Sequence, residues 1–355
     1  MRSKINIKDI AEKADVSIAT VSNVINNRGR VGEETRKKIM NIIEEYNYLP
    51  NELAKNLKLN KTDSIGVIVE DISVFNAPEI IKGIHAAAEE KQLSILLTNM
   101  GLFSKCGNEF PSVDQCKELA LPLYRQLVKS QVEGIIYIGV HPRDITGIIS
   151  DSKISIVYTY CYTRNEHDYT VNYDDEGGSY QITKYLINKG HSQIGLISGL
   201  INSKSSHARF RGYQKALSEH LLMFHPQFVK TGDWEYESGY RMALDLLHQE
   251  TKPTAIIAMN DLMAAGAIQA IKEQKLQVPD DVSVIGFDNR ELSGYHSPKL
   301  TTMSLPLEEM GKVAMNILHQ LKNNQNVVQK KYLLDCHLVE RESVGQRGQV
   351  PCPKC

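Results

Sequence analysis

The chain has 355 residues, of which 42% are hydrophobic and 23% are charged. This length suits two or three domains, and the composition is ordinary for a soluble globular protein. No apolar run of about 18 residues occurs, which excludes a bilayer-spanning helix, so we expect no membrane partner. The N-terminal segment is charged and lacks the apolar stretch of a secretory signal, so we expect a cytoplasmic protein.

The charge is unevenly distributed along the chain. Residues 1–60 hold 11 Lys and Arg against 8 Asp and Glu, a net charge of +3. The remainder holds 30 against 34, a net charge of −4. A basic first segment before an acidic body fits a head that binds nucleic acid, although a charge of this size is common and is weak support by itself.

Three short helices are predicted in this first segment. Asn6 can cap a helix over Ile7–Ala14, whose apolar residues recur at helical spacing. Ser17 can cap a second helix over Ile18–Asn26, and a third is expected at about Glu33–Glu45. Two short helices joined by a tight turn and followed by a third are typical of a helix-turn-helix DNA-binding domain. The alternative is a small helical bundle with no role in DNA binding.

The outward face of the second helix favours the DNA-binding interpretation. Its residues are short and uncharged, whereas an ordinary solvated face carries Lys and Glu. Short side chains let a helix approach base edges and phosphates closely. These residues are Ile18, Ala19, Thr20, Ser22, Asn23 and Asn26.

The segment Ile7–Asn26, which reads IKDIAEKADVSIATVSNVIN, resembles the head of the lactose-repressor/galactose-repressor family. So does YNYLPN at Tyr46–Asn51, followed by ELAKNL at Glu52–Leu57, and the resemblance extends over nearly the whole chain. It implies base contacts from Ile18, Ala19 and Asn23, and phosphate contacts from Thr20, Ser22 and Asn26.

One of these positions departs from the family pattern. The family very often has Arg where this chain has Asn23. Arg favours guanine, whereas Asn suits adenine, so the operator is expected to differ there from the usual half-site. Ile18 can offer only an apolar contact, such as one to a thymine methyl group.

A short helix is expected at Glu52–Leu57, capped by Asn51. Six residues do not hold a helix alone in water, so it should form when two copies pack together on DNA. Its apolar face consists of Leu53, Ala54 and Leu57. The resemblance implies that Leu57 wedges into the minor groove, and the alternative is plain packing within the helix pair.

From residue 64 onward, short apolar runs alternate with amphipathic stretches, which predicts parallel β-sheets covered by helices. The predicted strands are Ile65–Val69, Ser94–Thr98, Gly134–Ile138, Ile154–Thr159, Ile194–Ser198, Phe228–Thr231, Ala255–Met259 and Val282–Phe287. The resemblance implies two lobes like those of a periplasmic sugar-binding protein, joined by three crossovers near Asn172, Thr301–Thr302 and Lys330. The fold class is therefore α plus α/β.

The expected domain boundaries follow from these elements. They are a helix-turn-helix domain at 1–48, a hinge at 49–62, an effector-binding and dimerisation domain at 63–345, and a tail at 346–355. Within the third domain, lobe 1 is expected at about 63–172 and 302–330, and lobe 2 at about 173–301 and 331–345.

Ligands bind outside the carboxyl ends of parallel strands, so polar and aromatic residues after the strands are candidates for the effector site. An aromatic platform with polar and charged partners suits a polyhydroxylated ligand. Each candidate also has a structural alternative, such as a turn, a helix cap or packing, but the set matches the family's effector positions. The candidates are Phe75, Asn76, Arg209, Trp234, Asn260 and Asp288. Around Phe75 the chain departs from many relatives.

The sequence leaves the roles of two further segments open. Met100–Lys117 is longer than the loop of most relatives and is expected over the cleft, on the dimer surface or, with a slight preference, as a surface insertion. Cys352 and Cys355 form a C-x-x-C pair in the tail, but a structural zinc site needs four ligands and no second pair completes one. We therefore expect no metal and no cofactor.

The sequence favours a transcriptional regulator. No G-x-S-x-G, H-E-x-x-H, Walker or dinucleotide motif is present, which argues against an enzyme. A sugar-binding receptor would share the body but would need no helix-turn-helix. The expected partners are operator double-stranded DNA with palindromic half-sites, a second copy of the chain, and a small effector. A sugar is favoured as effector, and a purine, a nucleoside or a phosphorylated protein is the alternative. The tail lacks a leucine heptad repeat, which favours a dimer over a tetramer.

Overall fold

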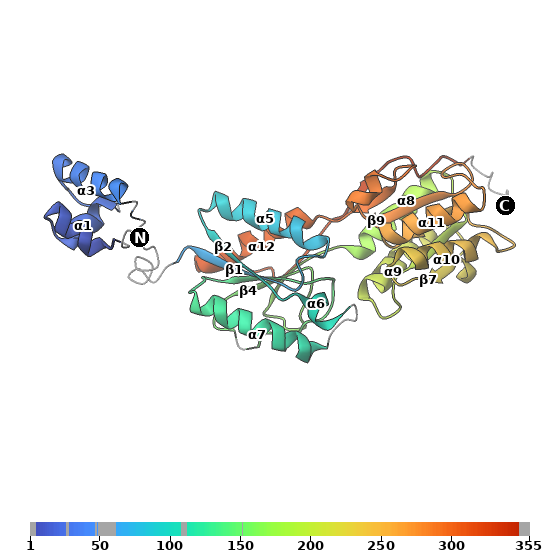
Figure 1. Ribbon diagram of the computed structural model, residues 1–355. Coiled ribbons are helices and arrows are strands. Elements are labelled where there is room, and N and C mark those ends of the chain that lie inside the picture. The colour runs from blue at the N-terminus through green and yellow to red at the C-terminus, as the bar shows by residue number, and fades with distance from the viewer. Residues whose placement is uncertain are drawn as a thin grey trace. The chain divides into compact units, whose positions relative to one another are not determined.

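A computed structural model of the protein describes residues 5–25, 28–46, 48, 62–107, 112–150 and 152–347 (Figure 1). Internal contacts divide the chain into two units, Met1–Thr62 and Asp63–Cys355. The predicted tail cysteines Cys352 and Cys355 lie outside the described residues.

The N-terminal unit consists of α1 (Ile7–Ala14), α2 (Ile18–Ile25) and α3 (Glu33–Glu45). A reciprocal capping box begins α1, because the Asn6 side chain accepts from the Asp9 N–H and the Asp9 carboxylate accepts from the Asn6 N–H. Ser17 caps α2 by accepting from the Thr20 N–H at 3.1 Å. The three predicted helices are thus confirmed. Their shared core is Ile10, Ala11, Ala14, Val21, Val24 and Ile39.

The larger unit contains two six-stranded sheets, and each sheet is the centre of one lobe. In lobe 1 the strand order is β11 (Lys331–Leu334), β5 (Tyr169–Tyr173), β4 (Ile156–Thr159), β3 (Ile135–Ile138), β1 (Ser64–Val69) and β2 (Ser94–Asn99). In lobe 2 it is β12 (His337–Val339), β10 (Thr301–Ser304), β9 (Ser283–Asp288), β8 (Ala255–Ala258), β6 (Ile194–Ser198) and β7 (Val229–Thr231). Neighbouring strands are parallel except for β12, which runs antiparallel to β10.

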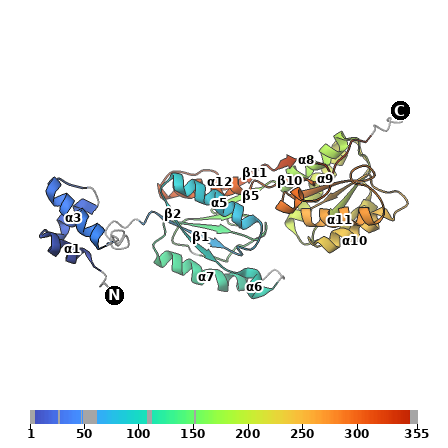
Figure 2. The same ribbon diagram turned by 45° about the horizontal axis from the view of Figure 1, so that its top comes forward.

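Helices cover both faces of each sheet. In lobe 1, α5 (Asn76–Glu90) and α12 (Leu307–Lys322) lie on one face, and α7 (Val113–Lys129) lies on the other (Figures 1 and 2). In lobe 2, α8 (Asp175–Asn188) pairs with α9 (Lys204–Glu219), and α10 (Tyr236–Leu247) pairs with α11 (Asp261–Glu273). The short elements are α6 (Leu102–Cys106), η1 (Pro226–Phe228) and η2 (Glu291–Gly294). Burial on both faces explains the continuous apolar runs of the central strands.

The crossovers between the lobes differ in part from the prediction. The first follows β5, close to its expected place. The second comes after Ser304, because Thr301–Ser304 pairs with β9 and still belongs to lobe 2. The third comes after Leu334, because Lys331–Leu334 pairs with β5 in lobe 1. The structure therefore gives lobe 1 as 63–173 and 305–334, and lobe 2 as 174–304 and 335–347. The predicted second and third crossovers were too early because these short strands, together with β5 and β12, were not recognised.

The connection from β3 to β4 contains no helix in the part that is described, residues 139–150 and 152–155. A buried ion pair holds it instead. Both oxygens of the Glu70 carboxylate accept from the Arg143 guanidinium, at 2.5 and 2.7 Å, and Glu70 also accepts from the Tyr137 hydroxyl and the Val140 N–H. Because Glu70 directly follows β1, this pair fixes the loop to the end of a central strand.

The segment Met100–Lys117 is built into lobe 1 where it is described. Its first part forms α6 and its last part begins α7, while residues 108–111 lie outside the described residues. Leu102 and Cys116 are buried in the lobe 1 core, and the Phe103 N–H donates to Asp71 at 2.9 Å. These residues anchor the described ends in the core, while most other side chains of the segment are exposed or half-buried. The preferred expectation of a surface insertion stays a prediction.

Glycines set the close approach of paired helices. A Cβ on Gly311 of α12 would lie 2.1 Å from the Ile80 carbonyl oxygen of α5. A Cβ on Gly266 of α11 would likewise lie 2.1 Å from the Tyr236 carbonyl oxygen of α10. Real Cβ atoms do not approach backbone so closely, so these helices can pack at their observed separation only because the side chain is a hydrogen atom.

Gly311→Ala is therefore expected to destabilise the larger unit by about 1–3 kcal/mol, because α12 must move away from α5. Urea unfolding followed by circular dichroism measures the change. Gly294→Ala is the matched control, because a Cβ on Gly294 meets nothing within 4 Å. Equal midpoints for the two variants would contradict the close-packing argument.

Candidate functional site

The outward face of α2 presents the predicted DNA-contacting residues. Ile18, Ala19 and Asn23 are exposed, with Ile18 at 44%, while Thr20 and Ser22 are half-buried. Val21 and Val24 occupy the opposite face, in the core. An isoleucine left exposed on a small domain has apolar surface available for a partner. Asn26, Leu53, Ala54 and Leu57 lie outside the described residues.

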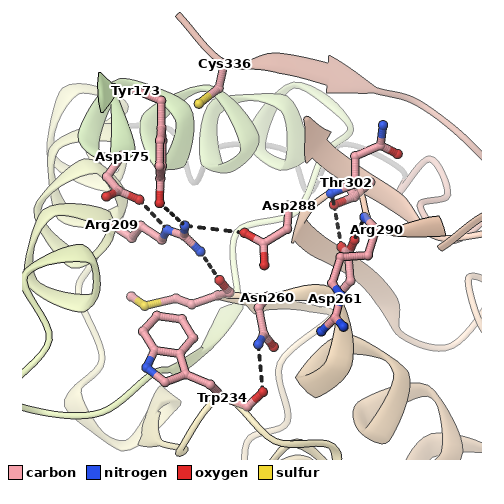
Figure 3. A network of polar contacts seen from close by, with 12 residues as sticks. Tyr173, Asp175, Arg209, Trp234, Asn260, Asp261, Asp288, Arg290, Thr302 and Cys336 are labelled. Atoms are coloured by element: carbon pink, nitrogen blue, oxygen red, sulfur yellow. Dashed lines mark hydrogen bonds and ion pairs between the residues drawn. The ribbon is translucent and has the colours of Figure 1, made fainter. Parts of the chain in front are cut away.

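In the larger unit, a buried polar network surrounds the guanidinium of Arg209 (Figure 3). Arg209 comes from α9 and its side chain is 4% exposed. Its Nε donates to Asp175 at 2.6 Å, and Nη2 lies 3.2 Å from the Tyr173 hydroxyl and 3.5 Å from Asp288. Nη1 donates to the Met259 carbonyl oxygen. The network thus joins the ends of β5, β8 and β9.

Trp234 and Asn260 lie beside this network. The Arg209 Cζ is 5.7 Å from the centre of the Trp234 ring, and the Asn260 Nδ2 donates to the Trp234 carbonyl oxygen at 2.7 Å. Asn260 also caps α11 by accepting from the Met263 N–H at 2.8 Å. Asn260 therefore acts as a helix cap, which was its structural alternative in the sequence, and it also positions the Trp234 backbone.

A third carboxylate, Asp261, is completely buried close to Asp288. It accepts from the Thr302 hydroxyl at 2.5 Å and from the Arg290 N–H at 2.6 Å. Burial raises the pKa of Asp261 to about 8, and the neighbouring Asp288 adds to the increase. Burial also raises the pKa of Asp288 to about 7, against the opposing influence of Arg209 and Arg290. Burial thus disfavours the ionised form of both Asp261 and Asp288.

A cavity of about 700 Å³ opens between the lobes next to Asp288, a volume that suits a small molecule. Phe75 and the start of α12 line it from lobe 1, and the residues from Asp288 to Leu292 line it from lobe 2. Two contacts cross between the lobes: the Arg290 guanidinium lies 5.1 Å from the Phe75 ring centre, and the Lys204 Nζ lies 3.5 Å from the Tyr162 ring centre. Both are cation–π contacts.

The backbone is strained at several of these positions. Trp234 has a φ of 77°, Asp288 of 107° and Tyr160 of 60°, all in the region that non-glycine residues rarely adopt. Such conformations cost about 1–3 kcal/mol each and are concentrated at functional sites. Their gathering at the facing ends of the two sheets supports a binding role for this region.

The structure thus brings together four of the predicted effector residues, Arg209, Trp234, Asn260 and Asp288. Phe75 lies at the adjoining cavity. Asn76 is fully buried and donates to the Gly139 carbonyl oxygen at 3.0 Å inside lobe 1. Sequence reasoning missed Asp175, Tyr173 and Arg290. The first two border β5, which was not predicted as a strand, and Arg290 follows Asp288 by two residues.

Comparisons with known proteins agree with this architecture. Residues 6–51 match bacterial regulatory proteins of the lacI family, and residues 183–344 match a periplasmic binding protein-like domain. The repressor PurR of Pasteurella multocida is 35% identical over 346 residues, which cover 96% of this chain and 99% of the relative. Catabolite control protein A of Priestia megaterium is 33% identical over 325 residues, or 91% and 94% of the two chains.

The chain belongs to the lacI family. This lacI-family protein also resembles the crystal structure of the Lac repressor dimer bound to operator and the anti-inducer ONPF, with a TM-score of 0.79 and 27% identity over 97% of this chain and 100% of that one. Like its relatives, it is a DNA-binding transcriptional regulator and not an enzyme.

No helix of the described residues is long and apolar enough to cross a membrane. Within the same residues, no three His, Cys, Asp or Glu side chains are grouped so that they can hold a metal ion.

The raised pKa of Asp261 predicts a pH dependence of stability. A buried carboxyl whose folded pKa is about 8, against 3.8 for the ordinary group, binds its proton more tightly in the folded state. Its stabilising contribution is complete at low pH and is lost as the pH rises from about 4 to about 8. Asp261→Asn is therefore expected to flatten the decrease in urea midpoint over this range. An unchanged pH profile would show that Asp261 is not the titrating group.

Proposed function

We propose that this lacI-family regulator reads its operator with the exposed face of α2 and changes its operator affinity when a small effector enters the cleft between lobes 1 and 2. The observation that carries the proposal is the cavity beside Asp288, bordered by both lobes and by the Arg209 network. A ligand there touches parts of the chain that can move relative to one another. A relative named ribose operon repressor supports a sugar as effector.

In this proposal, closure of the two lobes couples effector binding to operator binding. An effector shifts a conformational equilibrium only if it binds the two states with different affinity. The Arg290–Phe75 and Lys204–Tyr162 contacts exist only when the lobes are close, so a ligand that favours or opposes closure changes their population. In a homodimer on palindromic half-sites, this changes how two heads are presented to DNA. A regulator that reads bacterial operators acts in the cytoplasm.

A thermal-shift screen of sugars, sugar phosphates and purines tests the effector site, because a ligand that binds the folded state raises its melting temperature. We expect a hit that also changes operator affinity and that binds Arg209→Ala at least about 10-fold more weakly, equivalent to about 1.4 kcal/mol. Trp234→Leu is a second variant, since removing Arg209 leaves buried carboxylates unpaired.

Arg211→Ala is the matched control, because Arg211 lies on the same helix but is exposed and paired with Glu176. Trp234→Leu and Arg211→Ala should bind operator DNA without effector as the wild type does. A compound that changes operator affinity equally in the wild type, Arg209→Ala and Trp234→Leu acts elsewhere, and the cleft is then not the effector site.

The proposed base contact from α2 can be tested separately. Selection of binding sites from random duplexes is expected to give half-sites with adenine at the position read by Asn23, because Asn pairs with adenine N6 and N7. Asn23→Ala should lose this preference, worth about 1–3 kcal/mol, and Asn23→Arg should replace adenine by guanine. An identical selected sequence for all three proteins would exclude base contact by Asn23.

A further inference from the structure

Three residues that are far apart in the sequence meet where the chain enters the larger unit. Asp63 is the first residue of that unit, Glu133 lies two residues before β3, and Lys322 is the last residue of α12. The Lys322 Nζ forms ion pairs with Asp63 Oδ1, at 3.2 Å, and with Glu133 Oε2. The other carboxylate oxygen of Glu133 accepts from the Asp63 N–H at 3.1 Å. The three residues therefore form a closed ring of contacts next to the start of β1.

This ring is more buried than an ordinary surface ion pair. The side chains of Lys322 and Glu133 are 14% and 13% exposed. Burial lowers the pKa of Lys322, but the carboxylates of Glu133 and Asp63 outweigh this effect and hold the pKa above its ordinary value. An exposed ion pair contributes little because water competes for both charges and the side chains remain free to move. The burial of Lys322 instead confines its ammonium group to one position.

The backbone of Asp63 is held from both sides. Its N–H donates to Glu133, and its carbonyl oxygen accepts from the Ser94 N–H at 2.8 Å. Its φ of 45° lies in the left-handed region, which residues other than glycine rarely adopt. Such a conformation persists only where the surrounding contacts enforce it. The course of the chain into β1 therefore depends on the contacts of Asp63, and Lys322 holds its side chain.

The helix α12 gives Lys322 a fixed place in lobe 1. A Cβ on Gly134 would lie 2.6 Å from Leu318 Cδ1, so the last turns of α12 lie directly on the chain beside Glu133. The first residues of the helix line the cavity between the lobes. Its 16 residues span about 24 Å along α5 (Figures 1 and 2). One helix thus borders the cavity at its beginning and contacts the start of β1 at its end.

We propose that Lys322 is a positioning residue for operator binding, because by holding Asp63 it fixes the junction between the larger unit and the hinge predicted at 49–62. A junction held in one conformation has less freedom to lose when the protein binds DNA, so operator affinity is higher. Because α12 begins at the cavity, a movement of this helix also reaches Asp63 through Lys322. This second step rests on the proposed function, whereas the contact with Asp63 does not.

The operator affinity of full-length variants tests the contact, with the duplex that the wild type selects from random sequences as probe. Lys322→Met and Asp63→Asn are each expected to weaken binding about 10-fold, and the double variant should bind as Lys322→Met does, because both substitutions remove the same contact. Lys322→Arg keeps the positive charge and should bind nearly as the wild type does.

Lys189→Met is the matched control. Lys189 also caps the C-terminal end of a helix, α8, and pairs with a carboxylate, that of Glu340 at 2.8 Å, but it belongs to lobe 2. This variant should keep its operator affinity. Asp63→Asn decides the matter should Lys322→Met fail to fold, because the Asp63 side chain is 68% exposed and Asn adopts the same φ readily. Unchanged operator affinity in Asp63→Asn, or losses that add up in the double variant, would overturn the inference.

A change in the cleft that needs no ligand tests the second step. Phe75→Ala removes the ring that Arg290 contacts from the other lobe and is expected to change operator affinity about 2- to 5-fold, the effect of one cation–π contact. The change should disappear in the Asp63→Asn background. An equal change in both backgrounds would overturn the role of α12 but leave the proposed function standing. No change in either background would contradict the proposed function, while the comparison of Lys322 with Asp63 still decides the inference about operator binding.

Discussion

The buried ion pair of Arg209 with Asp175 and Asp288 is the interaction on which the arrangement of the larger unit depends. Arg209 belongs to lobe 2, Asp175 begins the first helix after the crossover, and Tyr173 ends a strand of lobe 1. A single guanidinium therefore ties together the end of β5 in lobe 1, the ends of β8 and β9 in lobe 2, and the chain that links the lobes. Breaking such a pair by removing one partner costs about 3–5 kcal/mol, because the other charges stay buried.

This arrangement explains why strained residues are tolerated at the facing sheet edges. Trp234 packs so tightly that a Cβ on Gly199 would lie 2.0 Å from its indole, and Asn260 holds its carbonyl group. Asp288 is fixed by Arg209 on one side and lies close to Asp261 on the other. The surrounding contacts determine these conformations more strongly than the residues' own backbone preferences.

Much of the fold was predictable from the sequence because its central strands are long and apolar and its helices are strongly periodic. The capping residues Asn6 and Ser17 marked helix starts directly. The strands that were missed are short and carry no long apolar run: Lys331–Leu334 reads KYLL, and Thr301–Ser304 contains two threonines. Such segments become strands because a neighbouring edge offers hydrogen bonds, which is a property of the assembled sheet.

The candidate site was predictable where a polar residue directly follows a recognised strand, as Asn260 and Asp288 do. The partners of Arg209 were harder to find. Asp175 and Tyr173 border a strand that was missed, and nothing in the residue type of Arg209 shows how many acceptors it will meet. The hydrogen-bond count of a buried group depends on the tertiary structure.

The discontinuity of lobe 1 has a consequence for synthesis on the ribosome. The helix α12 and the strand β11, which complete lobe 1, come from residues 307–334 near the end of the chain. Helices α1 to α3 emerge first and contain their own core. Strands β1 to β5, in contrast, are joined by α12 and β11 only after nearly all of lobe 2 has been translated. During that interval the part of the sheet that α12 will cover, over β3, β4 and β5, is open to solvent. The nascent chain therefore acquires its DNA-reading head well before the domain that controls it.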